Sequence, residues 1–115
     1  MEYEVKVSEA AEMQLKQISD YISVEVQAPQ AAENVLDDLQ QAILSLGAMP
    51  ERIPLSRNKF LKKHALHCMV VRQYLIYFQI DKTAAQVNVV AVIYGKRDQK
   101  AQMKTSYRHE KDFTP

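Results

Sequence analysis

Two runs of apolar residues with helical spacing, separated by a proline, constrain this chain more than any other feature. Both runs advance in steps of three or four residues, which puts their members on one face of a helix. The first run is Ala11, Leu15, Ile18 and Ile22, and the second is Ala32, Val35, Leu39, Ala42, Ile43 and Leu46. Pro29 pushes the residue before it toward an extended conformation and suits the first turn of a new helix. Helices joined by so few residues must run antiparallel, so the pattern predicts a helical hairpin.

The expected ends of this hairpin carry capping signals. Ser8 occupies the N-cap position of the first helix, and Glu9 and Glu12 lie in its first turn, where the helix dipole favours negative charge. Gly47 is expected to form a left-handed cap after the second helix, and Pro50 prevents the helix from continuing.

The second half of the chain is rich in β-branched and aromatic residues. These runs predict three antiparallel strands over residues 67–71, 74–80 and 87–94, joined by turns at 72–73 and 81–85. The alternation of Tyr3, Val5 and Val7 predicts a further strand that adds at an edge. Residues 48–63 are expected to form a basic loop. The predicted fold class is therefore α+β, with an N-terminal strand and an antiparallel helical hairpin packed on a small antiparallel β-meander.

The length of 115 residues suits one domain. We expect the domain to cover residues 1–98 and a polar C-terminal tail to cover 99–115, because Gly95 ends the last strand. No run reaches the roughly 20 apolar residues of a membrane span, and no signal-peptide pattern opens the sequence, which favours a cytoplasmic protein without a membrane partner. Cys68 is the only cysteine, so no internal disulfide is expected, and neither a metal site nor a cofactor is indicated.

Charge is divided sharply between the two halves. Residues 1–50 have a net charge of −7, and residues 51–115 have a net charge of +8. The basic half is expected to attract acidic side chains or phosphates, although the two halves could also neutralise one another in part. The candidate target-binding residues form a cluster before the sheet, one turn within it and a cluster after it: Arg57, Lys59, Lys62 and Lys63, then Arg72, then Lys96 and Arg97.

Signals for catalysis are sparse. His64 and His67 lie beside the basic loop and could move protons near neutral pH, but nothing pairs them with a nucleophile. Tyr74 and Tyr77 could stack on nucleic-acid bases, although packing within strands explains them equally well. Cys68 lies in an apolar run and is expected to be a small buried hydrophobic residue.

Five segments, in this order, resemble the RelE/ParE superfamily of bacterial toxins over residues 2–100. They are Tyr3-x-Val5-x-Val7-Ser8, Ile18-x-x-Tyr21-Ile22, Leu39-x-x-x-Ile43-x-x-Leu46, Tyr74-x-Ile76-Tyr77-x-x-Ile80 and Val92-x-Tyr94-Gly95-Lys96-Arg97-Asp98. The resemblance implies the toxin of a type II toxin–antitoxin pair, in a plasmid-stabilisation system, that a cognate antitoxin neutralises. The antitoxin segment is expected to be acidic or amphipathic and to bind the hairpin and a sheet edge, as a strand or as a helix in a groove. Its expected contacts are Ile18, Tyr21, Ile22 and Tyr77.

The superfamily contains two activities. The resemblance implies that individual residues distinguish them. One branch resembles RelE, a ribosome-dependent messenger-RNA endoribonuclease, and the other resembles ParE, which inhibits DNA gyrase by binding. Of the nuclease residues, the terminal arginine is present as Arg97, but the central-strand arginine is replaced by Leu75. The lysine pair falls near Leu66 and Cys68, and the terminal tyrosine falls near Met103.

Cleavage needs a stabilised phosphate charge and a proton acceptor, so these replacements favour the ParE-like branch without catalytic residues. In a shifted alignment, Arg72, Tyr94 or Tyr107 would stand in for the missing groups. The RelE-like ribonuclease, acting on the ribosome and messenger RNA through Arg97, remains the alternative. A third possibility is an inactive member that only binds its antitoxin.

Overall fold

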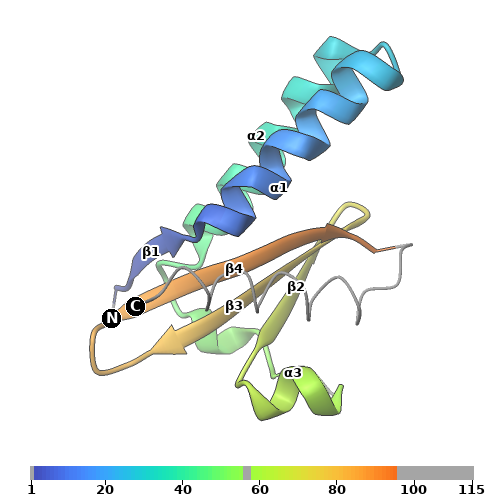
Figure 1. The fold of residues 1–115 in the computed structure, drawn as a ribbon. Helices are drawn as coiled ribbons and strands as arrows, with labels where there is room; N and C mark the ends of the chain where they lie inside the picture. The colour runs from blue at the N-terminus through green and yellow to red at the C-terminus, as the bar shows by residue number, and fades with distance from the viewer. Residues whose placement is uncertain (1, 56–57, 96–115) are drawn as a thin grey trace.

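The chain forms a four-stranded sheet with a helical hairpin on one face and a short helix on the other (Figure 1). This computed structural model describes residues 2–55 and 58–95, so the predicted tail over 99–115 lies outside the described residues. The strands lie in the order β1-β4-β3-β2. They are β1 (Glu4–Val7), β2 (His67–Val71), β3 (Tyr74–Asp81) and β4 (Gln86–Tyr94). The predicted α+β class and meander are confirmed.

One detail of the predicted sheet is wrong, because β1 pairs with β4 in parallel and the sheet is mixed. The backbone N–H of Glu4 donates to the carbonyl of Ala85 at 2.8 Å, and that of Ser8 donates to Val89 at 2.9 Å. Parallel neighbours need a long connection between them. Here the whole hairpin and the first two meander strands lie between β1 and β4, so the parallel direction is available.

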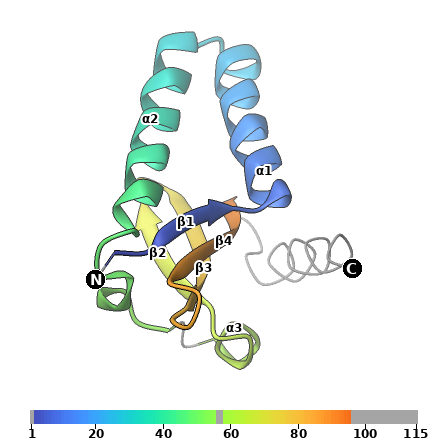
Figure 2. The ribbon, with the colours of Figure 1, turned by 90° about the vertical axis from the view of Figure 1, so that its left-hand side faces the viewer.

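The helical hairpin consists of α1 (Glu9–Asp20), a π-helical turn (Tyr21–Glu25) and α2 (Pro29–Ser45). The Ser8 hydroxyl accepts a hydrogen bond from the Ala11 N–H at 3.0 Å, which confirms the predicted N-cap. Ala11, Leu15, Leu39 and Ile43 are buried against the sheet, as the helical stripes predict. Beyond this contact the hairpin rises away from the sheet (Figure 2).

Gly47 does not form the predicted left-handed cap. The left-handed residue after α2 is Met49, with φ of 49°, and Gly47 has no positive φ. Gly47 instead allows a close backbone approach, because its carbonyl accepts a hydrogen bond from the Tyr3 N–H at 2.7 Å. A Cβ atom at this position would lie 3.1 Å from the Tyr3 carbonyl oxygen. The glycine therefore lets the chain entering β1 lie against the end of α2.

The prediction of a loop over residues 48–63 is also wrong. This segment contains a 3-10 turn (Pro50–Arg52) and the helix α3 (Lys59–Lys63). The Asn58 side chain accepts hydrogen bonds from Phe60 N at 2.9 Å and Leu61 N at 3.3 Å, which caps α3. Leu61 is buried under the sheet and holds the helix there. A short helix is stable here because it is capped and anchored at once.

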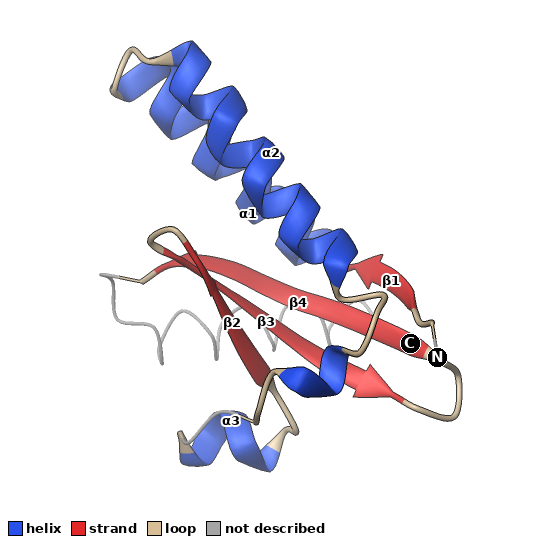
Figure 3. Cartoon of the chain, turned by 180° about the vertical axis from the view of Figure 1, so that it is seen from behind, coloured by secondary structure: helices blue, strands red, loops and turns tan. Residues whose placement is uncertain are grey.

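Apolar side chains pack on both faces of the two central strands. Phe78 and Ile76 face the hairpin, whereas Leu75 and Tyr77 belong to a second cluster with Leu61 on the opposite face. A bulge in the pairing of β3 with β4 lies between Tyr77 and Phe78. Figure 3 shows the hairpin and α3 on opposite sides of the sheet. Within the described part of the chain, no helix has the length and apolar character needed to cross a membrane.

Candidate functional site

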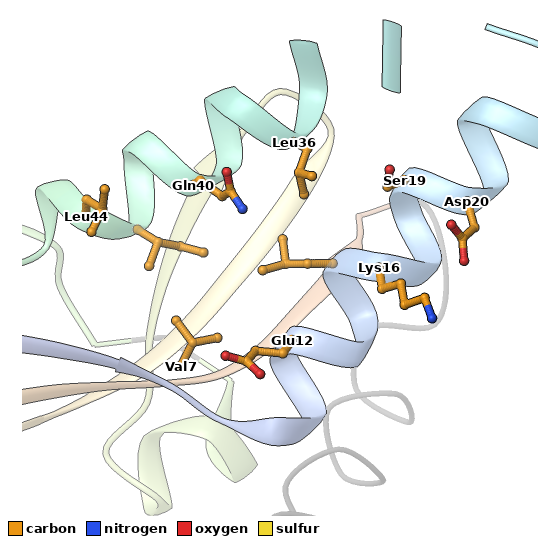
Figure 4. Close-up of a pocket in the computed structure, with 10 residues that line it drawn as sticks. Val7, Glu12, Lys16, Ser19, Asp20, Leu36, Gln40 and Leu44 are labelled. Carbon is orange, nitrogen blue, oxygen red and sulfur yellow. The ribbon is translucent and has the colours of Figure 1, made fainter. Parts of the chain in front are cut away.

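A groove with a volume of about 590 Å³ runs between α1 and α2 and reaches the edge strand β1 (Figure 4). Its base is apolar, and Leu36 and Gln40 extend into it from α2, whereas Lys16 and Asp20 point outward from α1. The lining residues are Val7, Glu12, Leu15, Lys16, Ser19, Asp20, Leu36, Gln40, Ile43 and Leu44. An apolar base with a charged rim suits the apolar face of a partner helix.

The four residues that the sequence marks for antitoxin binding do not form one surface. Ile18 and Ile22 are half-buried and pack against the core between hairpin and sheet. Tyr21 is 58% exposed near the hairpin tip, and Tyr77 is only 2% exposed on the other face of the sheet. Tyr77 is therefore a core residue in this structure, and a partner cannot contact its side chain without displacing its neighbours.

Sequence reasoning missed the groove because it followed the buried stripe of α2. A second stripe, Leu36, Gln40 and Leu44, advances in steps of four along the same helix and lines the groove. Leu44 is 71% exposed, which is unusual for a leucine in a small domain. The sequence signal for the groove is Leu44, which follows Ile43 but lies outside the apolar stripe that faces the sheet.

Large exposed hydrophobic side chains gather on the hairpin. Five of the eight in the described chain belong to it: Met13, Tyr21, Val24, Val26 and Leu44. They are spread over α1, the hairpin tip and α2, and only Leu44 of the five lines the groove. The hairpin therefore combines a groove, exposed apolar side chains and net negative charge.

The described members of the predicted basic clusters, Arg72 and the lysines of α3, lie at opposite ends of β2. Arg72 lies in the turn between β2 and β3, and the Gly95 N–H donates to the neighbouring Gln73 carbonyl at 2.8 Å, so the end of β4 lies beside this turn. The lysines of α3 precede β2 and are separated from Arg72 by the full length of that strand. Arg57, Lys96 and Arg97 lie outside the described residues.

The cations differ in their partners. Arg72 has a positive φ of 56°, and its Nε atom donates to Asp38 Oδ2 at 2.7 Å. Arg52 donates to the carbonyls of Ala48 and Met49, which follow α2. The α3 lysines Lys59, Lys62 and Lys63 are exposed, and none of them forms an ion pair within residues 2–55 and 58–95.

The positions of the superfamily's nuclease residues form an apolar layer where the structure describes them. Leu66 is fully buried, Leu75 is 9% exposed, and both pack with Tyr77 in the cluster under the sheet. Cys68 lies directly across from Tyr77 in the β2–β3 pairing, and burial raises the pKa of both side chains. Arg97, Met103 and Tyr107 lie outside the described residues. No group that could stabilise a phosphate occupies this layer.

The histidines serve the structure in their present positions. His67 Nδ1 lies 2.6 Å from the Ile53 carbonyl, and its ring stacks on Phe78. The carbonyl of His64 accepts a hydrogen bond from the Gln79 side chain at 2.7 Å. Among residues 2–55 and 58–95, His, Cys, Asp and Glu side chains form no group of three or more that could hold a metal ion.

The chain is similar to solved toxins of two kinds. The chromosomal ParDE toxin–antitoxin system from P. aeruginosa matches with a TM-score of 0.65 at 12% identity, over 80% of this chain and 95% of that chain. The toxin–antitoxin complex RelBE2 from Mycobacterium tuberculosis matches with a TM-score of 0.57 at 17% identity, over 82% and 99%. A mutant of the E. coli toxin RelE in the free state matches with a TM-score of 0.59 at 14% identity, over the full length of both chains.

These identities are low, so the structural matches establish the shared RelE/ParE fold alone. No curated protein matches the sequence. The family model described as the ParE toxin of the type II toxin–antitoxin system, parDE, matches residues 5–99, which is most of the chain. This protein therefore belongs to the ParE toxin family of type II toxin–antitoxin systems, within the RelE/ParE superfamily.

Proposed function

We propose that this toxin acts in the cytoplasm by binding and inhibiting DNA gyrase, without chemistry of its own, in a plasmid-stabilisation system. The observation that carries the proposal is the apolar layer formed by Leu66, Leu75 and Tyr77. A ribonuclease site would need cations and a proton acceptor at these positions. Leucine supplies neither.

The phenol and thiol in this layer do not replace the missing groups. Burial raises the pKa of Tyr77 and Cys68, so both side chains are protonated and uncharged near neutral pH. Each is a hydrogen-bond donor without a charge. Neither is a base that would accept the proton of a ribose hydroxyl, and neither carries positive charge to offset a pentavalent phosphate.

We further propose that the hairpin groove binds the cognate antitoxin. The groove offers an apolar base about two and a half helical turns long, since its lining on α2 runs from Leu36 to Leu44. An amphipathic helix places side chains at steps of three and four along such a groove. The rim residues Glu12, Asp20 and Lys16 would fix its register by charge.

A supercoiling assay run beside a translation assay tests the target. Purified toxin should inhibit supercoiling by gyrase and leave messenger RNA on translating ribosomes intact. If gyrase is unaffected and messenger RNA is cut, with the cutting lost in Arg97→Ala, the RelE-like activity replaces the proposal. If neither occurs and expression does not arrest growth, the chain only binds its antitoxin.

A further inference from the structure

Acidic and basic residues are separated more completely in the middle of the sequence than the net charges of the two halves indicate. Residues 17–51 contain six acidic residues and no lysine or arginine, whereas residues 52–80 contain six basic residues and no aspartate or glutamate. The first stretch covers most of the hairpin, and the second includes α3 and β2. The sheet separates the hairpin from α3 (Figure 3), so the acidic hairpin and the lysines of α3 lie on opposite sides of the sheet. Arg72 and Arg52, by contrast, contact α2 and the residues that follow it.

The helix α3 concentrates this positive charge. Lys59, Lys62 and Lys63 stand at positions i, i+3 and i+4, which are neighbours on one face of a helix. All three are exposed, while Leu61 turns toward the sheet and is buried. The helix therefore divides into an anchoring face and a face of three cations.

The lysine face is held in a fixed place. Asn58 caps the first turn, and the Leu66 N–H donates to the Leu61 carbonyl at 2.9 Å, which closes the helix onto β2. The Gln79 side chain donates to the His64 carbonyl at 2.7 Å and fastens the end of α3 to β3. The cations are thus presented from a helix that is capped at its N-terminus and attached to the sheet at its C-terminal end.

The protein does not neutralise this face in the described residues. The ion pairs of the described chain, Lys6 with Glu4 and Arg72 with Asp38, lie elsewhere. The three cations are therefore available to a negatively charged partner.

The chemistry of the surface favours nucleic acid over protein as that partner. Protein interfaces are depleted of lysine and enriched in aromatic residues, methionine and arginine, whereas nucleic-acid interfaces are more polar and strongly positive. No large exposed hydrophobic residue is found between Asn58 and Met69. The exposed apolar side chains gather on the hairpin instead. The two sides of the sheet therefore suit different classes of partner.

We infer that the lysine face of α3 binds the phosphate backbone of duplex DNA. The choice of duplex DNA rests on the proposed function, because gyrase acts on duplex DNA. Lysine contacts phosphate as a point charge, so the binding is independent of sequence and sensitive to salt. The DNA contact would add to the affinity of the toxin for the gyrase–DNA complex over gyrase alone.

Fluorescence anisotropy with a labelled duplex tests this inference without gyrase. We expect the full-length toxin to bind the duplex at about 50 mM salt and to lose affinity steeply toward about 200 mM. K62Q/K63Q should bind about tenfold more weakly or worse at the lower salt, and its slope of log K against log salt should be shallower by about 1.8, or about 0.9 for each phosphate contact. K6Q/K82Q removes the same charge away from α3 and should bind like the unmodified chain. Thermal melting of both variants confirms that they fold.

The inference is overturned if the toxin does not bind the duplex at the lower salt, or if K62Q/K63Q binds as K6Q/K82Q does. It is also overturned if an RNA hairpin of equal length binds substantially more tightly than the duplex. That result would show that the lysine face binds RNA. The proposed function fails by a separate result, namely that the toxin does not inhibit gyrase. The DNA-binding result can be interpreted in either case.

Discussion

Arg72 and Asp38 join the two oppositely charged parts of the molecule, with the Arg72 Nε atom 2.7 Å from Asp38 Oδ2. The pair links the β2–β3 turn to α2, and its side chains are 47% and 50% exposed. One of the predicted target-binding cations is therefore already paired within the chain. The contact neutralises part of the charge internally, as one of the two interpretations of the charge pattern allowed.

Breaking this pair should change stability little. A half-exposed ion pair contributes about 0.2–1 kcal/mol, because solvent screens it. We expect Arg72→Gln and Asp38→Asn each to lower the free energy of unfolding by less than about 1 kcal/mol, measured by urea denaturation. Asp37→Asn, on the neighbouring position of α2, is the matched control. A double-mutant cycle that gives a coupling of several kcal/mol would show that the pair clamps the hairpin to the sheet.

The groove proposal predicts that antitoxin binding and stability can be separated at adjacent positions. Leu44→Glu places a charge on an exposed side chain that lines the groove, so it should weaken antitoxin binding at least tenfold while the melting temperature stays near that of the unmodified chain. Gln41→Glu, on the same helix and also exposed, adds the same charge without lining the groove and serves as control. Equal antitoxin affinity for all three proteins, measured by calorimetry, contradicts the proposed binding site.

The core between hairpin and sheet should respond in the opposite way. Leu39 is fully buried there, so Leu39→Ala should cost about 2–5 kcal/mol through lost burial and the cavity left behind. Leu44→Ala, at an exposed position of the same helix, should cost less than about 1 kcal/mol. Urea denaturation measures both. A similar loss in the two variants would mean that the hairpin packs differently from the arrangement described above.

The hydrogen bond from the Tyr3 hydroxyl to the Glu51 carboxylate predicts a pH-dependent contribution to stability. It lowers the pKa of Glu51 from 4.5 and raises the pKa of Tyr3 from 10.0. The contribution of Glu51 to stability is present above the pKa of the carboxyl group in the unfolded chain. It is lost as pH falls through the lowered pKa of the folded state. The Tyr3 part is present below the unfolded pKa of the phenol and is lost as pH rises through the raised folded value.

Tyr3→Phe should therefore destabilise the domain most between these two limits. The difference from the unmodified chain should shrink below about pH 4 and above about pH 10. Urea denaturation over a pH series measures it, and Tyr21→Phe, at an exposed tyrosine, is the control. A difference that stays constant across the series would show that Tyr3 contributes by packing rather than through Glu51.

Local signals in the sequence predicted most of the fold. Ser8 caps α1, Pro29 begins α2, and the turn at residues 72–73 joins two strands, each as expected. These features depend on a residue and its near neighbours, which a sequence displays directly. The apolar run over 74–80 also predicted a central strand covered on both faces, and the run over 87–94 predicted the next strand.

The features that the sequence did not predict depend on distant residues. The parallel pairing of β1 with β4 and the contact of Gly47 with Tyr3 both form only when remote segments meet. The helix α3 was not predicted because two prolines precede it, although Asn58 is a capping residue. Leu61, which anchors α3, packs against strands that come later in the chain. Of the candidate site, the charge and the missing nuclease groups were readable in sequence. The groove was not, because it depends on how α1 packs against α2.

A titration of toxin against a fixed amount of gyrase tests the central claim most directly, because a binder and an enzyme differ in stoichiometry. We predict that supercoiling activity falls only as the toxin reaches or exceeds the concentration of gyrase, and that the cognate antitoxin restores it. The account is contradicted if gyrase stays active at every ratio, or if toxin far below the gyrase concentration abolishes activity with time, as a turning-over enzyme would.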